Sequence, residues 1–289
     1  QPIAQLAQVT NQLQTMLAAA ERIFAFLEER EEIETGKETC HIASLKGDVT
    51  FDHVKFGYSK EKIIIKDFSL KVKSGQKIAI VGPTGSGKTT LVKLLMRFYP
   101  LKDGAIYIDD CNIKNFNRED YRHAFGMVLQ DAWLFSGTIM ENLRYGKLDA
   151  TDEEVIASAK AAHIDHFIKT LPGGYSMELN EETSNVSSGQ KQLLTIARAI
   201  LANPKVMILD EATSNVDTRT EVLIQKAMDE LMKGRTSFII AHRLSTIQNA
   251  DVILVLNHGD IVEVGTHEEL LKKKGFYYDL YNSQFEKVS

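Results

Sequence analysis

The sequence predicts an α/β fold, in which helices cover a parallel β-sheet. Three short apolar runs rich in β-branched residues have the composition of strands buried on both faces of such a sheet. The runs are residues 78–81, 206–209 and 238–241. Helical patterns lie between and around them, over residues 88–98, 151–170 and 190–202. Strands that alternate with helices in this way indicate the α/β class.

Length and composition are those of a globular protein. The 289 residues carry 34 Lys+Arg and 39 Asp+Glu, a net charge of −5, and 44% of them are hydrophobic. The length suits one large domain or two small ones, and a slightly acidic chain is not expected to bind nucleic acid through bulk charge. Cys40 and Cys111 are too few for a disulfide scaffold and indicate a reducing compartment. No apolar run is long enough to span a bilayer, and the missing initiator Met indicates a piece of a longer protein.

The first element predicted is a helix over residues 1–34. A heptad-like apolar stripe runs along it, after which a run of acids and Thr35-Gly36 end the helix. The stripe includes Leu6, Leu13, Ala20 and Leu27. It could pack on its own domain, lie on a membrane surface or continue a helix from a missing segment. Few Lys or Arg lie on its polar face, which argues against the membrane surface.

The pattern changes to alternation after Gly47. Val49, Phe51, Phe56 and Tyr58, with a slip at Val54, predict a strand. Its pairing partner is expected over 63–73, followed by a turn at Ser74-Gly75. Further along, residues 131–203 contain no convincing strand and predict a helical insertion.

The strongest motif follows the first apolar run. Gly82-Pro83-Thr84-Gly85-Ser86-Gly87-Lys88-Thr89 fits the P-loop pattern and lies between a predicted strand and a predicted helix. Backbone N–H groups of such a loop, with Thr90 just inside the helix, would surround phosphates at a favourable helix dipole. Lys88 would reach the β- and γ-phosphates, and the Thr89 hydroxyl would bind Mg²⁺.

Polar residues also follow the other two runs. The second run ends in Asp210-Glu211, so Asp210 is placed to hold Mg²⁺ and Glu211 to act as general base on the attacking water. The third run is followed by His242, which by the same geometry points to the phosphate crevice. Ligands of open α/β sheets gather at the carboxyl ends of the strands.

Together these motifs resemble the nucleotide-binding domain of ABC transporters of the exporter type, over about residues 45–285. The resemblance implies a RecA-like P-loop NTPase core with an N-terminal antiparallel β subdomain and an inserted α-helical subdomain. It makes the N-terminal helix an extension from a missing transmembrane domain. The expected division is residues 1–34 for the extension and 35–289 for the nucleotide-binding domain, with its core at about 45–130 and 204–289 and its helical subdomain at about 131–203.

The resemblance assigns roles that spacing does not. It implies that Tyr58 stacks on adenine and that Gln130 contacts Mg²⁺ and links the core to the helical subdomain. It makes His242 the switch histidine at the γ-phosphate and Asp217 a D-loop residue that touches the opposite domain. Two further phrases typical of exporters are residues 134–139 (LFSGTI) and 265–270 (GTHEEL).

The family signature Leu-Ser-Gly-Gly-Gln is matched by Val186-Ser187-Ser188-Gly189-Gln190. In this family the signature of one domain closes over ATP held by the P-loop of another. The resemblance therefore implies that Ser187, Gly189 and Gln190 bind nucleotide through a helix N-terminus. Ser188 departs from the pattern, because it adds a Cβ and a hydroxyl where the backbone approaches the phosphate.

A complete P-loop half beside an altered signature resembles one subunit of heterodimeric exporters. The upstream segment Asn180-Glu181-Glu182 also departs from the usual Gly-Glu-Arg. We therefore expect a heterodimer with a second ABC nucleotide-binding domain, and low ATPase activity without it. The alternative is that Ser188 is tolerated and the chain works as a homodimer.

The function implied is that of the ATPase of a membrane exporter, with ATP and Mg²⁺ as ligands and the transmembrane domain of the same transporter as a partner. It would lie at the cytoplasmic face of the cell membrane. Two alternatives are a soluble ABC-class ATPase acting on DNA or ribosomes and a non-hydrolysing nucleotide-dependent clamp. Residues 89–186 lack the sustained heptads of chromosome-type members, and Glu211 and His242 argue against a clamp.

Overall fold

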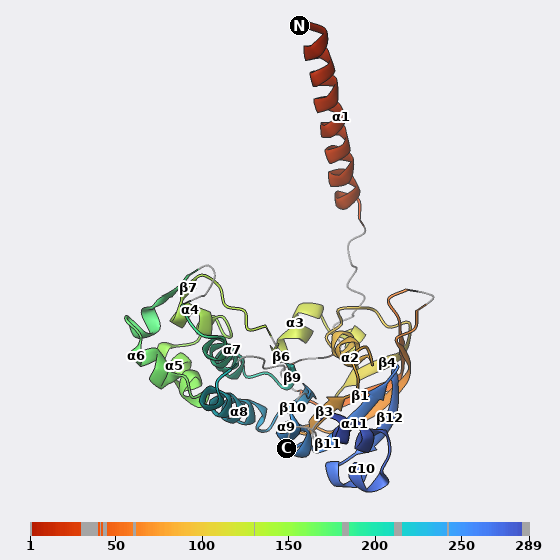
Figure 1. Ribbon diagram of the computed structural model, residues 1–289, viewed down its shortest axis with the longest axis vertical. Helices are drawn as coiled ribbons and strands as arrows, with labels where there is room; N and C mark the ends of the chain where they lie inside the picture. Colours follow the sequence, from red (N-terminus) through yellow and green to blue (C-terminus); the bar gives the residue numbers. More distant parts are fainter. Residues whose placement is uncertain are drawn as a thin grey trace. The chain divides into compact units, whose positions relative to one another are not determined.

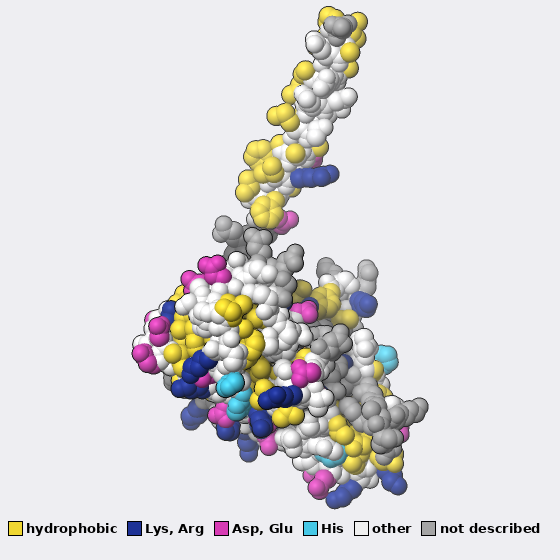
Figure 2. Space-filling view, turned by 60° about the vertical axis from the view of Figure 1, so that its left-hand side comes forward, with side chains coloured by type: hydrophobic (Ala, Val, Ile, Leu, Met, Phe, Trp, Pro, Cys, Tyr) yellow, Lys and Arg dark blue, Asp and Glu magenta, His cyan; other side chains and the backbone are white. Residues whose placement is uncertain are grey.

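The computed structural model describes residues 2–29, 40, 42, 45–59, 62–129, 131–180, 185–210, 216–241 and 243–284. The chain forms two compact units, Gln1–Thr35 and Gly36–Ser289 (Figure 1). The first contains helix α1 (Pro2–Leu27), which has no buried residue. Its large apolar side chains are exposed and run along its length in Figure 2. The helix ends before Glu28 and Glu29, so these two acids follow it rather than form its last turn.

Within the described part of the chain, no helix combines the length and the apolar character that a membrane crossing requires.

The second unit begins with an antiparallel sheet of strand order β2-β1-β4-β5. On β1 the alternating residues Val49, Phe51, Val54 and Phe56 are all buried, and the pairing register shifts between Phe51 and Val54. A bulge therefore accounts for the slip in the sequence pattern. Tyr58 lies just beyond the strand. The bounds are β1 Val49–Phe56, β2 Ile65–Val72, β4 Asp103–Ile108 and β5 Cys111–Asn112.

The central sheet has six strands in the order β12-β11-β3-β10-β9-β6, of which all but β12 are parallel. The three apolar runs of the sequence form β3, β10 and β9, side by side in its middle, which confirms the predicted α/β class. The bounds are β3 Lys77–Val81, β6 Phe125–Val128, β9 Val206–Asp210, β10 Thr236–Ile240, β11 Val252–Asn257 and β12 Asp260–Gly265.

The central sheet is buried on both faces because successive side chains of a strand point to opposite sides. On β3, Ile78 and Ile80 join a core cluster shared with the antiparallel sheet and α2 (Lys88–Leu95). Ala79 and Val81 join a second cluster, which contains α7 (Ser188–Ala202) and α8 (Thr218–Met232). Full burial of one Ile or Leu side chain contributes about 1.5–3 kcal/mol, so apolar runs at these positions hold three layers together.

Helices α4, α5, α6 and α7 lie to one side of the central sheet in Figure 1. The helix predicted over 151–170 is two helices, separated near His163, whose φ is +57°. The expectation of no strand was wrong, because two-residue strands β7 and β8 pair here. The bounds are β7 Gly137–Thr138, α4 Ile139–Arg144, α5 Asp152–Ala161, α6 Asp165–Thr170, η3 Gly174–Ser176 and β8 Glu178–Leu179.

Short elements complete the second unit around the central sheet. They include η2 Ile113–Asn115, α3 Arg118–His123, α9 Leu244–Gln248, α10 His267–Lys273 and α11 Phe276–Gln284. A disulfide joins Cys40 to Cys111, with 6.5 Å between their Cα atoms. This crosslink joins the segment before β1 to the first residue of β5.

Candidate nucleotide-binding site

The P-loop connects β3 to α2, as its sequence position predicts. Gly82 follows β3 with φ +152°, and a Cβ added to it would lie 2.2 Å from the Leu256 carbonyl oxygen on β11. The backbone of β11 therefore leaves no room for a side chain at the first position of the loop. On the other side, the Gly259 N–H donates to the Ser86 carbonyl oxygen at 3.0 Å. The end of β11 and the turn after it thus hold the P-loop in place, a support that the sequence pattern did not reveal.

The Lys88 side chain lies across the P-loop itself. Its Nζ donates to the carbonyl oxygens of Gly82, at 2.7 Å, and Pro83, at 3.0 Å. Burial lowers the pKa of Lys88, and the charge of Asp210 partly offsets this. The Ser86 hydroxyl is buried and has no hydrogen-bond partner among the described residues. The loop therefore holds a cation over its own backbone, as an anion-binding loop requires.

A cavity of about 480 Å³ opens at this loop. Three charged residues line it, Lys62, Lys88 and Asp210, and this excess of positive charge suits an anionic phosphate chain. Seven residues expected from the sequence line it together, and Lys62, Ile64 and Ile240 were not anticipated. The seven are Thr84, Gly85, Gly87, Lys88, Thr89, Thr90 and Asp210.

Asp210 reaches the cavity because β9 ends there. It pairs with Ile240, the last residue of the neighbouring parallel strand β10, and β3 ends beside them at the P-loop. Parallel strands present their carboxyl ends at one edge, which is why residues far apart in sequence meet here. The roles of Gln130, Glu211 and His242 stay predictions, because all three lie outside the described residues.

The residues present fit a magnesium nucleotide. The Thr89 side chain is exposed at the cavity and faces the same space as Asp210. Among the described residues, no group of three His, Cys, Asp or Glu side chains could hold a metal ion alone. Mg²⁺ commonly takes one or two protein oxygens and completes its shell with water and phosphate oxygens. Thr89 and Asp210 together offer two protein oxygens for such a site.

Tyr58 stands at the edge of the same region. Its hydroxyl lies 3.4 Å from the Thr90 Oγ1 on α2, close enough for a hydrogen bond, and half of the residue is exposed, at 51%. Thr90 lines the cavity, so the two residues connect the cavity to an exposed aromatic ring. This placement is compatible with the predicted stacking on adenine, which stays a prediction.

The signature residues form the start of α7. Ser187 caps the helix: its Oγ accepts from the Gln190 N–H at 3.3 Å, while the Gln190 Oε1 accepts from the Ser187 N–H at 2.8 Å. Gly189 is buried, and a Cβ added to it would lie 2.5 Å from the Thr220 Cγ2 on α8. Ser188 is exposed. None of these residues is among the described residues that line the P-loop cavity.

Asp217 has a structural role within its own chain. It caps α8, where its Oδ1 accepts from the N–H groups of Arg219, at 3.1 Å, and Thr220, at 3.0 Å. Hydrogen bonds from Thr220, the largest contribution, and from Arg219 lower the pKa of the Asp217 carboxyl. The predicted contact with an opposite domain stays a prediction.

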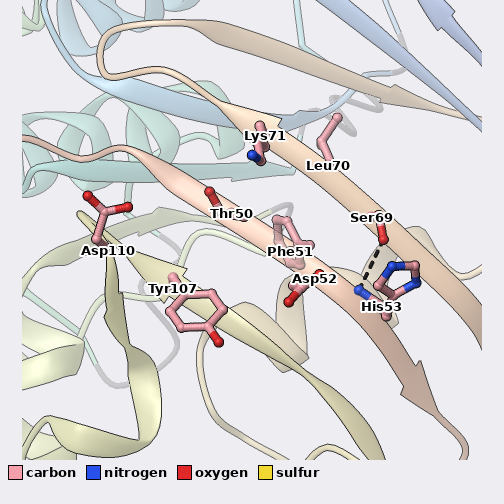
Figure 3. A pocket seen from close by; sticks show the side chains of 9 residues that line it. All are labelled: Thr50, Phe51, Asp52, His53, Ser69, Leu70, Lys71, Tyr107 and Asp110. Carbon is pink, nitrogen blue, oxygen red and sulfur yellow. Dashed lines mark hydrogen bonds between the residues drawn. The ribbon is translucent and has the colours of Figure 1, made fainter.

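A second hollow, of about 530 Å³, lies on the antiparallel sheet and includes Thr50, Tyr107 and Asp110 (Figure 3). The His53 N–H donates to the Ser69 Oγ across it, at 3.0 Å. His53 also contacts Asp67, which raises the histidine pKa through a hydrogen bond. None of the expected site residues is among those that line this hollow, so its chemistry is unrelated to the motifs. The P-loop cavity is the candidate site.

Comparison with known proteins places these features in a family. The profile of a family described as ABC transporter matches residues 65–214. An uncharacterized ABC transporter ATP-binding protein of Bacillus subtilis is 53% identical over 286 residues, which are 99% of this chain and 47% of that protein. A fatty acid ABC transporter ATP-binding/permease protein of Mycobacterium tuberculosis is 53% identical over 279 residues, 96% of this chain and 44% of that protein.

A third relative and a solved structure give the same picture. An ATP-dependent lipid A-core flippase of Desulfotalea psychrophila is 47% identical over 283 residues, 98% of this chain and 49% of that protein. The structure of a bacterial Atm1-family ABC exporter with ATP bound superposes with a TM-score of 0.83 at 38% identity, over 97% of this chain and 49% of that chain. The chain spans about half the length of the curated relatives it matches.

Proposed function

Because this chain belongs to the ABC transporter family, with the fold and P-loop of an ABC-type ATPase, we propose that it binds and hydrolyses ATP as the motor domain of a membrane exporter. In that role it would stand at the cytoplasmic face of the cell membrane and act on a transmembrane domain of the same transporter. One observation carries the proposal. Lys88 and Thr89 of the P-loop share one cavity with Asp210 from the end of β9.

Three side chains of the cavity have distinct tasks in the proposed reaction. Lys88 exchanges its contacts with the Gly82 and Pro83 carbonyl oxygens for phosphate oxygens, and the P-loop N–H groups hold the phosphate chain. Thr89 and Asp210 would hold Mg²⁺, which would supply charge stabilisation at the phosphates. Preorganised positive groups of this kind lower the barrier to phosphoryl transfer because they need not reorient during the reaction.

The remaining catalytic roles fall to three residues outside the described part of the chain. Glu211 acts as the general base on water, while Gln130 and His242 sense the γ-phosphate. Glu211 follows Asp210 directly in the sequence, which supports its proximity to the cavity.

The rate of ATP hydrolysis by the whole chain tests this function. Lys88→Ala should lower kcat by at least about 100-fold, because it removes the cation of the phosphate cradle. Lys93→Ala is the matched control: Lys93 is in the same helix, is not among the described residues that line the cavity, and should keep wild-type turnover. Equal activity in both variants would remove Lys88 from the mechanism.

A second variant separates hydrolysis from a nucleotide-dependent clamp. Glu211→Gln should abolish hydrolysis and retain ATP binding, whereas Glu230→Gln, a surface carboxylate near the end of α8, should change neither. Unchanged hydrolysis in Glu211→Gln would show that Glu211 is not the base.

The names of relatives pair an ATP-binding part with a permease, which supports the exporter over an ATPase acting on DNA or ribosomes.

We further propose that the functional unit is a dimer of two nucleotide-binding domains, preferably with a partner of different sequence. The support is a contrast within the signature. Gly189 is enclosed by α8, whereas Ser188 is exposed at the first turn of α7. An exposed Ser188 side chain is accessible to a partner's nucleotide, so we expect its hydroxymethyl group to weaken the use of this signature by a second copy of the chain.

Turnover of the isolated chain tests the heterodimer. The wild type should hydrolyse ATP slowly, a second ABC domain with a regular Leu-Ser-Gly-Gly-Gln signature should stimulate it, and Ser188→Gly should raise its turnover without a partner. Ser283→Gly, a serine-to-glycine change in α11, controls for the substitution itself. Fast, cooperative turnover by the wild type alone would favour the homodimer.

A further inference from the structure

Three aromatic rings meet beyond the end of β1. The ring centroid of Tyr58 lies 5.0 Å from that of Phe56 and 5.1 Å from that of Tyr99, with interplanar angles of 85° and 86°. Phe56 and Tyr99 also contact each other, with centroids 5.6 Å apart. Tyr58 is thus held edge-to-face by two rings, the arrangement that aromatic pairs prefer.

The ring packing fixes an otherwise exposed side chain. Tyr58 is 51% exposed, while Phe56 is 3% exposed and belongs to the core. The hydrogen bond between the Tyr58 hydroxyl and Thr90 Oγ1 is long, at 3.4 Å. A tyrosine with half of its surface in water and one long hydrogen bond would sample several rotamers, unless neighbouring rings restrict it. Tyr99 supplies the second of these rings.

The segment that carries Tyr99 is itself fixed at both ends. Before it, the Phe98 N–H donates to the Lys93 carbonyl oxygen of α2 at 2.9 Å. After it, the Lys102 N–H donates to the Lys55 carbonyl oxygen of β1 at 3.1 Å, and the Lys102 ammonium donates to the carbonyl oxygen of Ser59. Tyr99 is therefore attached to α2 on one side and to the segment around Tyr58 on the other.

We propose that Tyr99 is a positioning residue, which holds the Tyr58 ring in the orientation that stacks on the adenine of ATP. The inference rests on the proposed nucleotide-binding function. Helix α2 begins at Lys88 in the phosphate cradle and leads directly into the Tyr99 segment. One short helix thus sets the spacing between the phosphate site and the aromatic platform for the base. Tyr99 acts through Tyr58 and makes no contact with the base.

The test compares two ligands that differ in the presence of the nucleoside. Dissociation constants of the whole chain are measured by calorimetry for Mg-ATP and for Mg-tripolyphosphate, which carries no base. Tyr99→Ala should weaken ATP binding by about 3- to 10-fold, the range expected for loss of a ring pair that orients a stacking residue. Tripolyphosphate binding should stay unchanged, because the P-loop is intact. A general defect in folding would weaken both ligands equally and overturn the proposal.

Matched variants isolate the ring of Tyr99. Tyr99→Phe keeps the ring and should bind ATP like the wild type, and Tyr99→Leu keeps apolar volume without a ring and should bind like Tyr99→Ala. Tyr99→Leu also carries the test if Tyr99→Ala does not fold. Phe98→Ala is the control from the same segment: Phe98 is similarly exposed, at 45%, but its ring contacts Arg122, so both ligands should bind normally.

Tyr58→Ala separates failure of this inference from failure of the proposed function. If Tyr58→Ala weakens ATP binding and Tyr99→Ala does not, the positioning role is wrong and the adenine platform stands. If neither variant changes the ratio of the two constants, Tyr58 is not the platform and the inference falls with it. In the double variant, no further loss beyond Tyr58→Ala is expected. An additive loss would mean that Tyr99 contacts the base directly.

Discussion

Helices α2 and α7 both begin at sequence motifs that resemble phosphate-binding sites, and they begin in different ways. Gly87 precedes α2 with φ +106°, and no side chain caps that helix. Ser187 precedes α7 and forms a capping box with Gln190. The first N–H groups of any helix lack partners within the helix. At α7, the Ser187 side chain accepts a hydrogen bond from one of these N–H groups. At α2 no side chain does so, which suits the binding of a phosphate there.

The surroundings of the two helix starts also differ: charged groups lie around the start of α2, whereas close packing surrounds the start of α7. At α2, Lys88, Lys62 and Asp210 line one cavity, so charged groups are already concentrated there. At α7, the packing of Gly189 on α8 determines the geometry. The P-loop is therefore prepared to bind nucleotide by itself. The start of α7 is stabilised by its own capping box and by packing on α8, which suits the proposed role of the signature at a nucleotide held by a second domain.

The largest expected effect is at the P-loop. Gly82→Ala should lower the free energy of unfolding by about 3 kcal/mol or more, because strained backbone and a clash with the Leu256 carbonyl oxygen add together. It should also abolish ATP binding. Gly85→Ala is the matched control: Gly85 has φ +81° and nothing within 4 Å of an added Cβ, so backbone strain alone should cost about 1 kcal/mol. Thermal unfolding checks both, and equal costs would refute the role of the β11 backbone.

The same change at the signature should destabilise the fold and spare the nucleotide site. Gly189→Ala places a Cβ 2.5 Å from the Thr220 Cγ2 and 3.0 Å from the Val216 Cγ1, so overpacking should cost about 1–3 kcal/mol. Mg-ATP binding by the isolated chain should change by less than about 2-fold, because Gly189 is not among the described residues that line the P-loop cavity. Thermal unfolding and calorimetry provide the two measurements.

A second substitution tests whether this cost is steric. Thr220→Ser removes the Cγ2 atom and keeps the hydroxyl, so it should recover part of the stability that Gly189→Ala loses. The exposed neighbour provides the control, because Ser188→Ala should change stability by no more than about 0.5 kcal/mol. Absence of rescue would place the cost of Gly189→Ala in the contact with Val216 and not in the contact with Thr220.

The capping box gives a smaller effect. Ser187→Ala removes the side-chain acceptor at the start of α7 and should cost about 1 kcal/mol of stability. Thr151 forms the same capping box with Glu154 at the start of α5, so Thr151→Ala should cost a similar amount. The two variants should differ in function. Only Ser187→Ala should weaken the ATP-dependent association with a partner domain, and an equal weakening in both would remove the signature from the dimer interface.

The sequence predicted these two helix starts unequally, and for a physical reason. The P-loop depends on local chemistry: glycines for positive φ, a lysine, and a strand and a helix on either side. The P-loop pattern itself can be recognised within eight consecutive residues of the sequence. The packing of Gly189 on Thr220, like the contact of Gly82 with Leu256, depends on residues brought together by the tertiary fold. Lys62, Ile64 and Ile240 line the cavity because the tertiary fold brings them there, so the local sequence pattern could not predict them.

Elements without a strong local pattern escaped prediction as well. Strands β7 and β8 have only two residues each, too few to show a period of two. Tyr99 sits 41 positions after Tyr58 in the sequence, and the contact between the rings exists because the segment after α2 returns to β1. The disulfide between Cys40 and Cys111 likewise closes a sequence separation of 71 residues, which a count of cysteines does not reveal.

The smallest expected effect concerns Asp217, whose helix adjoins the signature. Hydrogen bonds to the carboxylate, led by the one from Thr220, lower its pKa in the folded chain. Between the lowered pKa and the unfolded value of about 3.9, the unfolded state binds more protons. The stabilisation is therefore present above about pH 4 and is lost as the pH falls through the folded pKa. Acidification should thus weaken the start of α8 and leave the uncapped start of α2 unaffected.

Asp217→Asn keeps a capping oxygen without the charge, so it should lower the melting temperature slightly at pH 7 and match the wild type in strong acid. Asp279→Asn, at an acid in the first turn of α11, controls for the loss of one negative charge from the chain. Melting curves of the three proteins from pH 7 to pH 3 provide the measurement. If the difference between Asp217→Asn and the wild type stayed constant over this range, the carboxylate charge would have no part in capping α8. The contrast with the P-loop would then rest on the capping box of Ser187 and the packing of Gly189 on α8.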